Sequence, residues 1–287
     1  MAKGRELKGR IKSIENTRKI TRTLEMVATS KMKRAQDRVQ AARPYAQSLA
    51  EVIAGLYSPD LAERFPLLRQ PAKVNHAAVI LLTSNRGLAG GFNSNLIKEA
   101  RSLLARLDGQ GVETELHIVG KKGLGFFRYI GRNIASSRID ITDKPTAENA
   151  SEIVGDLLDR FVSGQIDAVY VVHSKYVSAL SSPPASIQIL PVTPPERTGP
   201  RPDYILHPSA DAILGELLPL YVRNAVYRGL VENEAGFQSA QRNAMKNATD
   251  NAGEILNLLR RTYNRARQAQ ITQEIAEIVG GSAALEG

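Results

Sequence analysis

Two stretches at the ends of this chain are too long, as helices, to lie inside a compact globule. Residues 3–56 and 220–281 are rich in helix-forming residues, and their apolar positions recur in steps of three and four. At about 1.5 Å per residue these helices would be about 80 Å and about 93 Å long. A compact chain of this size has a diameter of only about 50 Å, so we expect both helices to project from it.

A projecting helix exposes its apolar stripe, and the partner most readily available to each terminal helix is the other one. The middle of the chain lies between them in sequence, so they are predicted to pair as an antiparallel coiled coil. Pro44 is expected to kink the first helix, Pro219 to break or restart the second, and Gly280-Gly281 to end it. The small residues Ala28, Ala35 and Ala42 suggest close approach of another helix. The stripe of the first helix is predicted to contain these apolar residues: Leu7, Ile11, Ile14, Ile20, Leu24, Val27, Met32, Ala35, Val39 and Ala42.

The middle of the chain changes from long helical periodicity to short apolar runs that alternate with helical segments. The runs over 76–83 and 167–174 are almost continuously apolar, which is typical of strands buried on both faces. This alternation predicts an α/β domain with a mainly parallel sheet, whose last strand pairs with its predecessor as a hairpin. The other predicted elements are strands at 115–119, 134–139 and 186–192 and helices at 93–107, 121–131 and 146–163.

Proline-rich stretches at 57–73 and 193–208 read as linkers. They divide the chain into an N-terminal coiled-coil helix over 1–56, an α/β globular domain over 74–193 and a C-terminal coiled-coil helix over 209–287. The predicted fold class is therefore a mixture of α+β and α/β, with a long antiparallel two-helix coiled coil and a Rossmann-like α/β domain.

The net charge of the chain is +9, from 38 Lys and Arg against 29 Asp and Glu. Residues 1–43 hold thirteen of the bases and only four of the acids, so the first helix carries the whole excess. Such an excess suggests a nucleic acid or an acidic protein as the partner. Nucleic-acid sites usually interleave aromatic residues, and this segment has none, which favours an acidic protein. The alternative is a basic coiled-coil nucleic-acid-binding protein with an α/β appendage, whose DNA binding would weaken steeply with salt.

The sequence predicts no catalytic, cofactor or metal site. Cys is absent, which excludes disulfides, thiol nucleophiles and Cys-ligated metals. The loop over 84–93 stands where a phosphate cradle would lie, but it lacks the Gly-Lys-Ser/Thr ending and the G-x-G-x-x-G pattern. We predict a structural turn there, with a ligand or partner contact as the alternative. No run is apolar enough to span a membrane. Four histidines are predicted to be structural rather than metal ligands: His76, His117, His173 and His207.

Motifs at both ends and in the middle of the chain carry a resemblance to a known family. The segments that match are Ile11-Lys12-Ser13-Ile14 through Lys19-Ile20-Thr21, residues 26–32, residues 84–92, Tyr263-Asn264-Arg265-Ala266-Arg267-Gln268 and Ile271-Thr272-Gln273-Glu274. With these segments the chain resembles the gamma subunits of bacterial-type F-type ATP synthases over essentially its whole length. Ser282 departs from the Ala usual after the double glycine, and the missing Cys excludes the thiol regulation of plastid members.

The resemblance implies a central rotor shaft of the F1 sector that couples proton-driven rotation to ATP synthesis or hydrolysis and performs no chemistry itself. The implied partners are a ring of three alpha and three beta subunits, the epsilon subunit and a membrane c-ring, with no nucleic acid and no cofactor. The implied location is the cytoplasmic side of the bacterial inner membrane, as a peripheral subunit. A Met start without a transit segment agrees with a bacterial origin.

The resemblance also implies, by position, which residues contact the ring. Gln268 and Thr272 are the expected wall contacts, whose replacement should weaken coupling or assembly without unfolding the α/β domain. Met26→Lys should impair coupling, because a new buried charge is costly. The full predicted set is Met26, Lys31, Arg267, Gln268, Thr272, Glu274 and Glu277.

Overall fold

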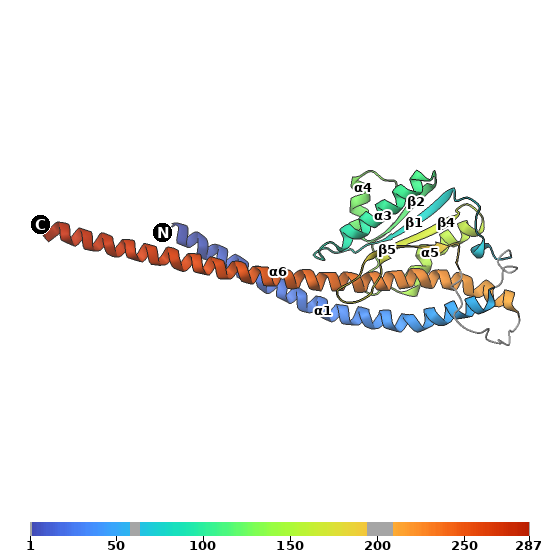
Figure 1. Cartoon of the computed structure of the whole chain (residues 1–287), viewed down its shortest axis with the longest axis horizontal. Coiled ribbons are helices and arrows are strands. Elements are labelled where there is room, and N and C mark those ends of the chain that lie inside the picture. The colour runs from blue at the N-terminus through green and yellow to red at the C-terminus, as the bar shows by residue number, and fades with distance from the viewer. Residues whose placement is uncertain (1, 58–63, 194–208, 287) are drawn as a thin grey trace. The chain divides into compact units, whose positions relative to one another are not determined.

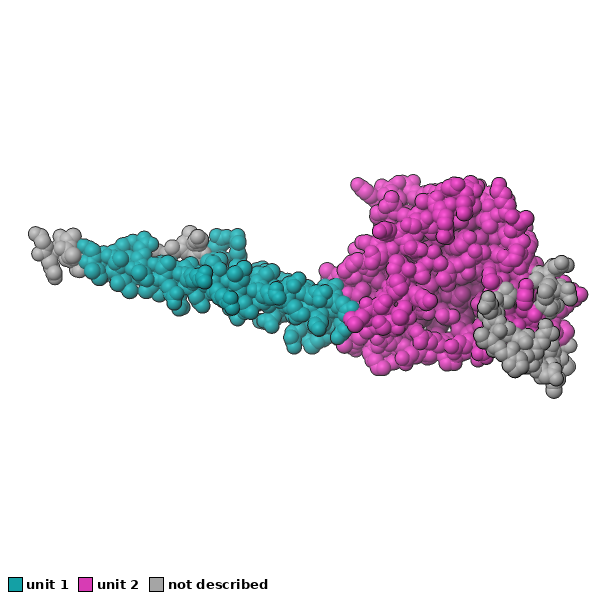
Figure 2. Space-filling model, in the orientation of Figure 1, with its two compact units in different colours: residues 1–28, 242–287 teal, residues 29–241 magenta. Residues whose placement is uncertain are grey.

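The computed structural model describes residues 2–57, 64–193 and 209–286, and the side chains of residues 5–57, 64–193 and 209–280 (Figure 1). The chain contacts form two compact units (Figure 2). The first unit consists of residues 1–28 and 242–287, and the second of residues 29–241. The three regions expected from the sequence stay a prediction.

The two terminal helices are confirmed. Helix α1 spans Ala2–Leu56 and helix α6 spans Ala210–Glu286, so each contributes residues to both units. Helix α1 continues through Pro44. The predicted break at Pro219 is wrong, since α6 also continues through this residue. Apolar side chains on both sides of Pro219 are buried and hold the adjoining turns against the core: Leu214, Leu218 and Val222.

The predicted end of the last helix at Gly280-Gly281 is also wrong, because α6 continues to Glu286. A glycine inside a helix costs only about 1 kcal/mol relative to alanine. The residues that follow, from 282 to 286, include no proline and are mostly good helix formers. Two glycines alone therefore do not stop this helix.

The second unit contains one five-stranded sheet in the order β3-β2-β1-β4-β5. The pairs β1–β2, β1–β4 and β2–β3 are parallel, and β4–β5 is antiparallel, which confirms the mainly parallel sheet with a terminal hairpin. The strands are β1 His76–Leu82, β2 Glu113–Val119, β3 Ser136–Arg138, β4 Ala168–Ser174 and β5 Pro184–Leu190. The helices between them are α3 Phe92–Gly109, α4 Lys121–Tyr129 and α5 Ala147–Val162.

The sheet is covered on both faces, as the apolar run of β1 predicted. Ile80 and Leu82 belong to a core with residues of α1, α5 and α6, whereas Val79 and Leu81 belong to a core with α3 and α4. Figure 1 shows the same two layers, with α3 and α4 on one side of the sheet and α5 and α6 on the other. The alternation of side chains along a strand produces this division.

Part of the first predicted linker belongs to the core. Pro66–Leu68 forms a single 3₁₀ turn, and Leu67 and Leu68 are buried. The N–H of Val192 donates to the carbonyl of Leu67 over 2.8 Å. Residues 58–63 of this linker and residues 194–208 of the second linker lie outside the described residues.

Helix α6 approaches the sheet closely because glycines face it. A Cβ atom on Gly229 would lie 3.3 Å from a methyl group of Leu82. At Gly236 a Cβ atom would lie 2.5 Å from Ser174 Oγ and 3.2 Å from the ring of Phe92. These distances leave no room for a side chain at Gly236. The α6 backbone there therefore packs directly against the end of β4 and the start of α3.

We expect Gly236→Ala to lower the free energy of unfolding by about 1–3 kcal/mol, because overpacking outweighs the gain in helix propensity. The control is Gly155→Ala on α5, where a Cβ atom would meet nothing within 4 Å. This change should stabilise the protein by up to about 1 kcal/mol. Urea unfolding followed by circular dichroism measures both effects. Equal changes in the two variants would contradict the close approach at Gly236.

Candidate partner-binding surface

The first unit is an antiparallel pair of helices with a narrow seam. Thr249 Oγ1 lies 2.8 Å from Thr21 Oγ1, and Arg260 forms a salt bridge with Glu15. Residue numbers rise along α1 as they fall along α6, which establishes the antiparallel direction. Ala28 and Ala252 are buried with the two threonines. Met245 and Leu256 of α6 are buried as well, so the seam contains small, polar and large apolar side chains.

The predicted stripe of the first helix is wrong at two positions in this unit, whereas Ile11, Ile14 and Leu24 are half-buried. Ile20 and Val27 are 60% and 48% exposed, whereas the adjacent Thr21 and Ala28 are buried. The expected close approach at Ala28 is confirmed, as it is at Ala35 in the second unit. Residues seven apart therefore form the seam, and larger apolar residues beside them remain on the surface.

The last part of α6 exposes apolar side chains that a monomer would normally cover. Gln268 and Thr272 lie on this exposed segment. An apolar surface of this kind is typical of a site that binds another protein. The exposed apolar side chains are Ile271, Ile275, Ile278 and Val279, with exposed fractions between 47% and 72%.

Charged and amide residues of this segment are also exposed. Glu274 accepts a hydrogen bond from Gln270 over 2.9 Å, and Glu277 accepts one from Gln273 over 2.9 Å. Both pairs join residues four apart on one helix, so they support the helix locally. Arg267 is exposed as well. Five of the predicted contact residues therefore lie together on the surface of α6.

Met26 belongs to the first unit and is 59% exposed, near the exposed Ile20 and Val27 on the same helix. Lys31 is different, because it lies in the second unit and has a partner within the chain. Its Nζ is 2.9 Å from Asp143 Oδ2, and this hydrogen bond holds the pKa of Asp143 below its ordinary value. Whether any of the seven residues contacts a partner stays a prediction.

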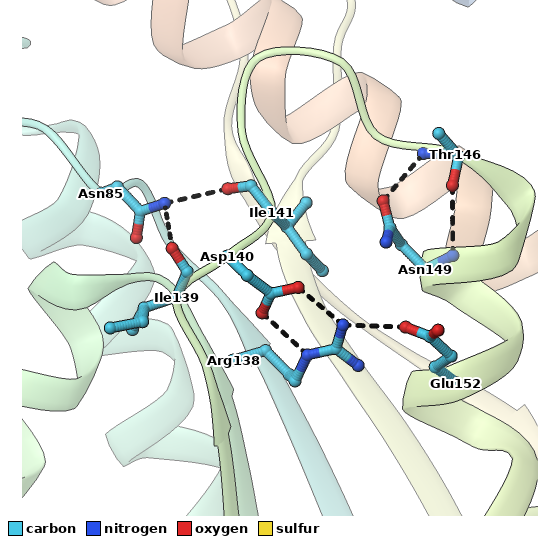
Figure 3. A network of polar contacts seen from close by, with 8 residues as sticks. All are labelled: Asn85, Arg138, Ile139, Asp140, Ile141, Thr146, Asn149 and Glu152. Atoms are coloured by element: carbon cyan, nitrogen blue, oxygen red, sulfur yellow. Dashed lines mark hydrogen bonds and ion pairs between the residues drawn. The ribbon is translucent and has the colours of Figure 1, made fainter.

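Asp143 lies on the loop between β3 and α5. A polar network stabilises this loop (Figure 3). Arg138 donates to both carboxylate oxygens of Asp140, at 2.8 and 2.7 Å, and to Glu152 at 2.8 Å. These contacts lower the pKa of Asp140 to about 2. Asn85 donates to two main-chain carbonyls of the loop, at 3.0 and 2.9 Å. These hydrogen bonds fix the loop, so Asp143 is held in position to contact α1.

The helix that follows this loop begins as the sequence predicted. Thr146 Oγ1 accepts a hydrogen bond from the N–H of Asn149, and the Asn149 side chain accepts one from the N–H of Thr146 (Figure 3). This reciprocal capping satisfies two donors at the start of α5. It also fixes the end of the loop that carries Asp143.

Buried polar side chains attach α6 to the end of β4. Glu232 accepts a hydrogen bond from the N–H of Tyr176 over 3.2 Å, and its carboxylate lies 3.6 Å from His173 Nε2. Asn233 accepts from the N–H of Ser174 over 3.3 Å. Burial alone would raise the pKa of Glu232, but the neighbouring imidazole and Arg228 hold it below its ordinary value. The sequence did not predict these contacts between α6 and the end of β4.

Helix α6 also occupies the crevice where open α/β sheets usually bind a ligand. Such crevices lie at the carboxyl ends of the strands, where the strand order reverses, which here is between β1 and β4. Only about 170 Å³ remains between Ser84–Arg86, Asp143 and the side of α6 that carries Glu234 and Gln238. Burial raises the pKa of Glu234 to about 7, and Gln238 donates to its carboxylate over 2.6 Å.

The loop after β1 also has hydrogen bonds within itself, besides those that Asn85 makes to the loop before α5. Asn93 Oδ1 accepts from the N–H of Ser84 over 3.0 Å, and Ser84 Oγ donates to the carbonyl of Arg86 over 2.6 Å. Leu88 has φ 61°, so a non-glycine residue occupies a left-handed position. Within the described ranges, no three His, Asp or Glu side chains are placed to hold a metal ion.

The predicted structural histidines have local partners. His117 Nδ1 lies 2.7 Å from Ser136 Oγ, and its Nε2 lies 3.2 Å from Glu115. His76 pairs with Glu113 at 3.2 Å. His207 lies outside the described residues.

Two long antiparallel helices joined to a sheet of this order define a class of fold that occurs in rotary ATP synthases. The rotor of the Euglena gracilis mitochondrial ATP synthase has a chain with TM-score 0.67 and 18% identity, covering 94% of this chain and 99% of that one. A central-stalk chain of the Tetrahymena thermophila mitochondrial enzyme has TM-score 0.62 and 23% identity, covering 80% and 99%. These likenesses establish the fold.

Sequence comparison is more specific. The family model described as ATP synthase matches residues 3–285. The ATP synthase gamma chain of Gemmatimonas aurantiaca is 67% identical, over 100% of both chains. That of Pelotomaculum thermopropionicum is 43% identical, over 98% of this chain and 99% of the relative. This chain therefore belongs to the ATP synthase gamma chain family, as its motifs indicated.

The raised pKa of Glu234 leads to a testable pH dependence. Its pKa rises from 4.5 to about 7 on folding, so ionisation should cost stability as the pH rises through this interval. We expect Glu234→Gln to be more stable than the parent at pH 8 by about 1–3 kcal/mol, and the difference to vanish near pH 4. Urea unfolding at several pH values measures it.

The control for this experiment is Glu216→Gln, which removes the same charge from an exposed position of α6. A similar pH-dependent gain in both variants would indicate an effect of net charge and contradict the role of burial at Glu234.

Proposed function

We propose that this chain is the central rotor shaft of the F1 sector of an ATP synthase, which transmits rotation between a membrane c-ring and the catalytic sites of a ring of three alpha and three beta subunits. The observation that carries this function is the exposed apolar segment of α6, around Gln268 and Thr272. A helix with such a surface needs other subunits around it, and the full-length relatives of this chain are named ATP synthase gamma chains, which supports placing it inside such a complex.

The shaft would act by contact rather than by chemistry. Its two helices differ in side chains around their circumference, so each catalytic site would meet a different face and be biased toward a different state. The basic residues of the first helix suit acidic loops on the surrounding subunits. The crevice of the sheet is filled by α6, which supports a non-catalytic role for this chain.

Torque would enter through the second unit, where the epsilon subunit and the c-ring are the proposed partners. Here α6 is held by Glu232 and Asn233, and α1 by the bonds from Lys31 and Arg38 to Asp143. The proposed location is the cytoplasmic side of the bacterial inner membrane, as a peripheral subunit. None of the described helices combines the length and the apolar character that a membrane span requires.

The test is Gln268→Ala/Thr272→Ala in the assembled complex, in membrane vesicles. We expect proton pumping per ATP hydrolysed to fall at least fivefold, since each lost hydrogen bond is worth about 1 kcal/mol, or a factor of about five. Dye quenching measures pumping, and phosphate release measures hydrolysis. The far-ultraviolet circular dichroism of the purified chain should not change.

The matched control is Gln47→Ala/Thr262→Ala, which removes the same groups from exposed helix positions. Met26→Lys should also reduce pumping, because a charge would enter a covered surface. Pumping that keeps its normal ratio to hydrolysis in the Gln268/Thr272 variant would refute the proposed wall contacts.

A further inference from the structure

A groove in the second unit shares only Arg38 with the contacts assigned above to the shaft function. It lies between α1, the first turns of α5, and α6, and has a volume of about 510 Å³. Small-molecule sites typically have volumes of about 300–1,000 Å³. All three helices belong to the same compact unit, so the groove is formed within one body.

The floor of the groove is largely apolar. The rings of Tyr45 and Tyr227 and the side chain of Leu220 line it, and the small Ala42 leaves the space open. Tyr45 is 56% exposed and Leu220 is 40% exposed. Aromatic and aliphatic side chains around a concave surface are what an acyl chain or a ring would contact.

Two arginines give the groove its charge. Arg38 lines it from α1 and Arg223 from α6. Arg38 Nη1 donates to the carbonyl of Asp143 over 2.7 Å, which orients its guanidinium, and Arg223 is exposed to solvent. Among the described residues that line the groove, none is an Asp or a Glu. The groove therefore combines an apolar floor with uncompensated positive charge.

We propose that this groove binds a small amphipathic carboxylate of the fatty-acid type. The carboxylate would accept hydrogen bonds from Arg223 and Arg38, since guanidinium and carboxylate form strong, directional pairs. The acyl chain would lie against Tyr45, Tyr227 and Leu220. Binding at this place would join α1, α5 and α6 of the second unit through one ligand.

The probe is dodecanoate, used below its micellar concentration with the full chain. The chain has no Trp, so Tyr45→Trp places a single fluorescent reporter in the groove. We expect a saturable change of its emission with dodecanoate, and binding of dodecanol, which has the same chain without the charge, at least tenfold weaker. Absence of saturation would overturn the proposal, as would equal binding of the alcohol.

Two variants in this background locate the site. Arg223→Glu should weaken binding at least tenfold, and Ala41→Phe, which fills the groove from an exposed position, should weaken it similarly. The control is Arg261→Glu, the same charge change at an exposed position of α6 in the first unit, which should bind normally. Circular dichroism verifies folding. Unchanged binding in the two groove variants, or equal weakening in the control, would overturn the proposed site.

Discussion

The contact between α6 and the carboxyl ends of β1 and β4 is the constraint on which the second unit depends. Gly229 and Gly236 bring the helix backbone onto the sheet, and Glu232 and Asn233 complete hydrogen bonds that the chain leaving β4 would otherwise lack. A buried N–H without a partner costs about 1–3 kcal/mol, so these side chains hold the helix in one position. The crevice at the carboxyl ends of β1 and β4, where such sheets usually bind a ligand, therefore holds helix α6 instead.

In the first unit, far fewer contacts hold the two helices together. Its seam buries only a few side chains: Thr21, Ala28, Met245, Thr249, Ala252 and Leu256. Burial contributes about 25 cal/mol per Å² of apolar surface, so a short set of this kind gives modest stability to the pair. Other large apolar residues, among them Ile20, Val27 and Ile271, stay exposed. Exposed apolar side chains of this kind suit the helices to being enclosed by other subunits, as proposed above.

Much of the fold follows from local sequence. The continuous apolar runs predicted β1 and β4, and Thr146 with Asn149 marked the start of α5. The buried face of α1 was harder to predict. Thr21 and Ala28 are buried and the neighbouring Ile20 and Val27 are exposed, although the isoleucine and the valine are the more apolar residues.

The polar contacts that attach α1 and α6 to the α/β part of the second unit could not be predicted from the sequence. Glu232 meets His173, and Asp143 meets Lys31, across long separations in the chain. In the sequence, a polar helix residue that is buried cannot be told from one that is exposed to solvent. Only the folded structure distinguishes these two cases. The predicted contact residues of α6 were proposed from the family motifs rather than from periodicity.

The contacts of Asp143 also fix the rotation of α1 about its own axis. Lys31 binds the carboxylate of Asp143, and Arg38, two turns later on the same face, donates to its carbonyl. Sliding α1 by one residue would rotate both side chains by about 100° and lose both bonds. One loop residue therefore helps to set the register of this part of α1, together with the hydrogen bond from Gln36 to Tyr176 and the buried Ala35 and Val39.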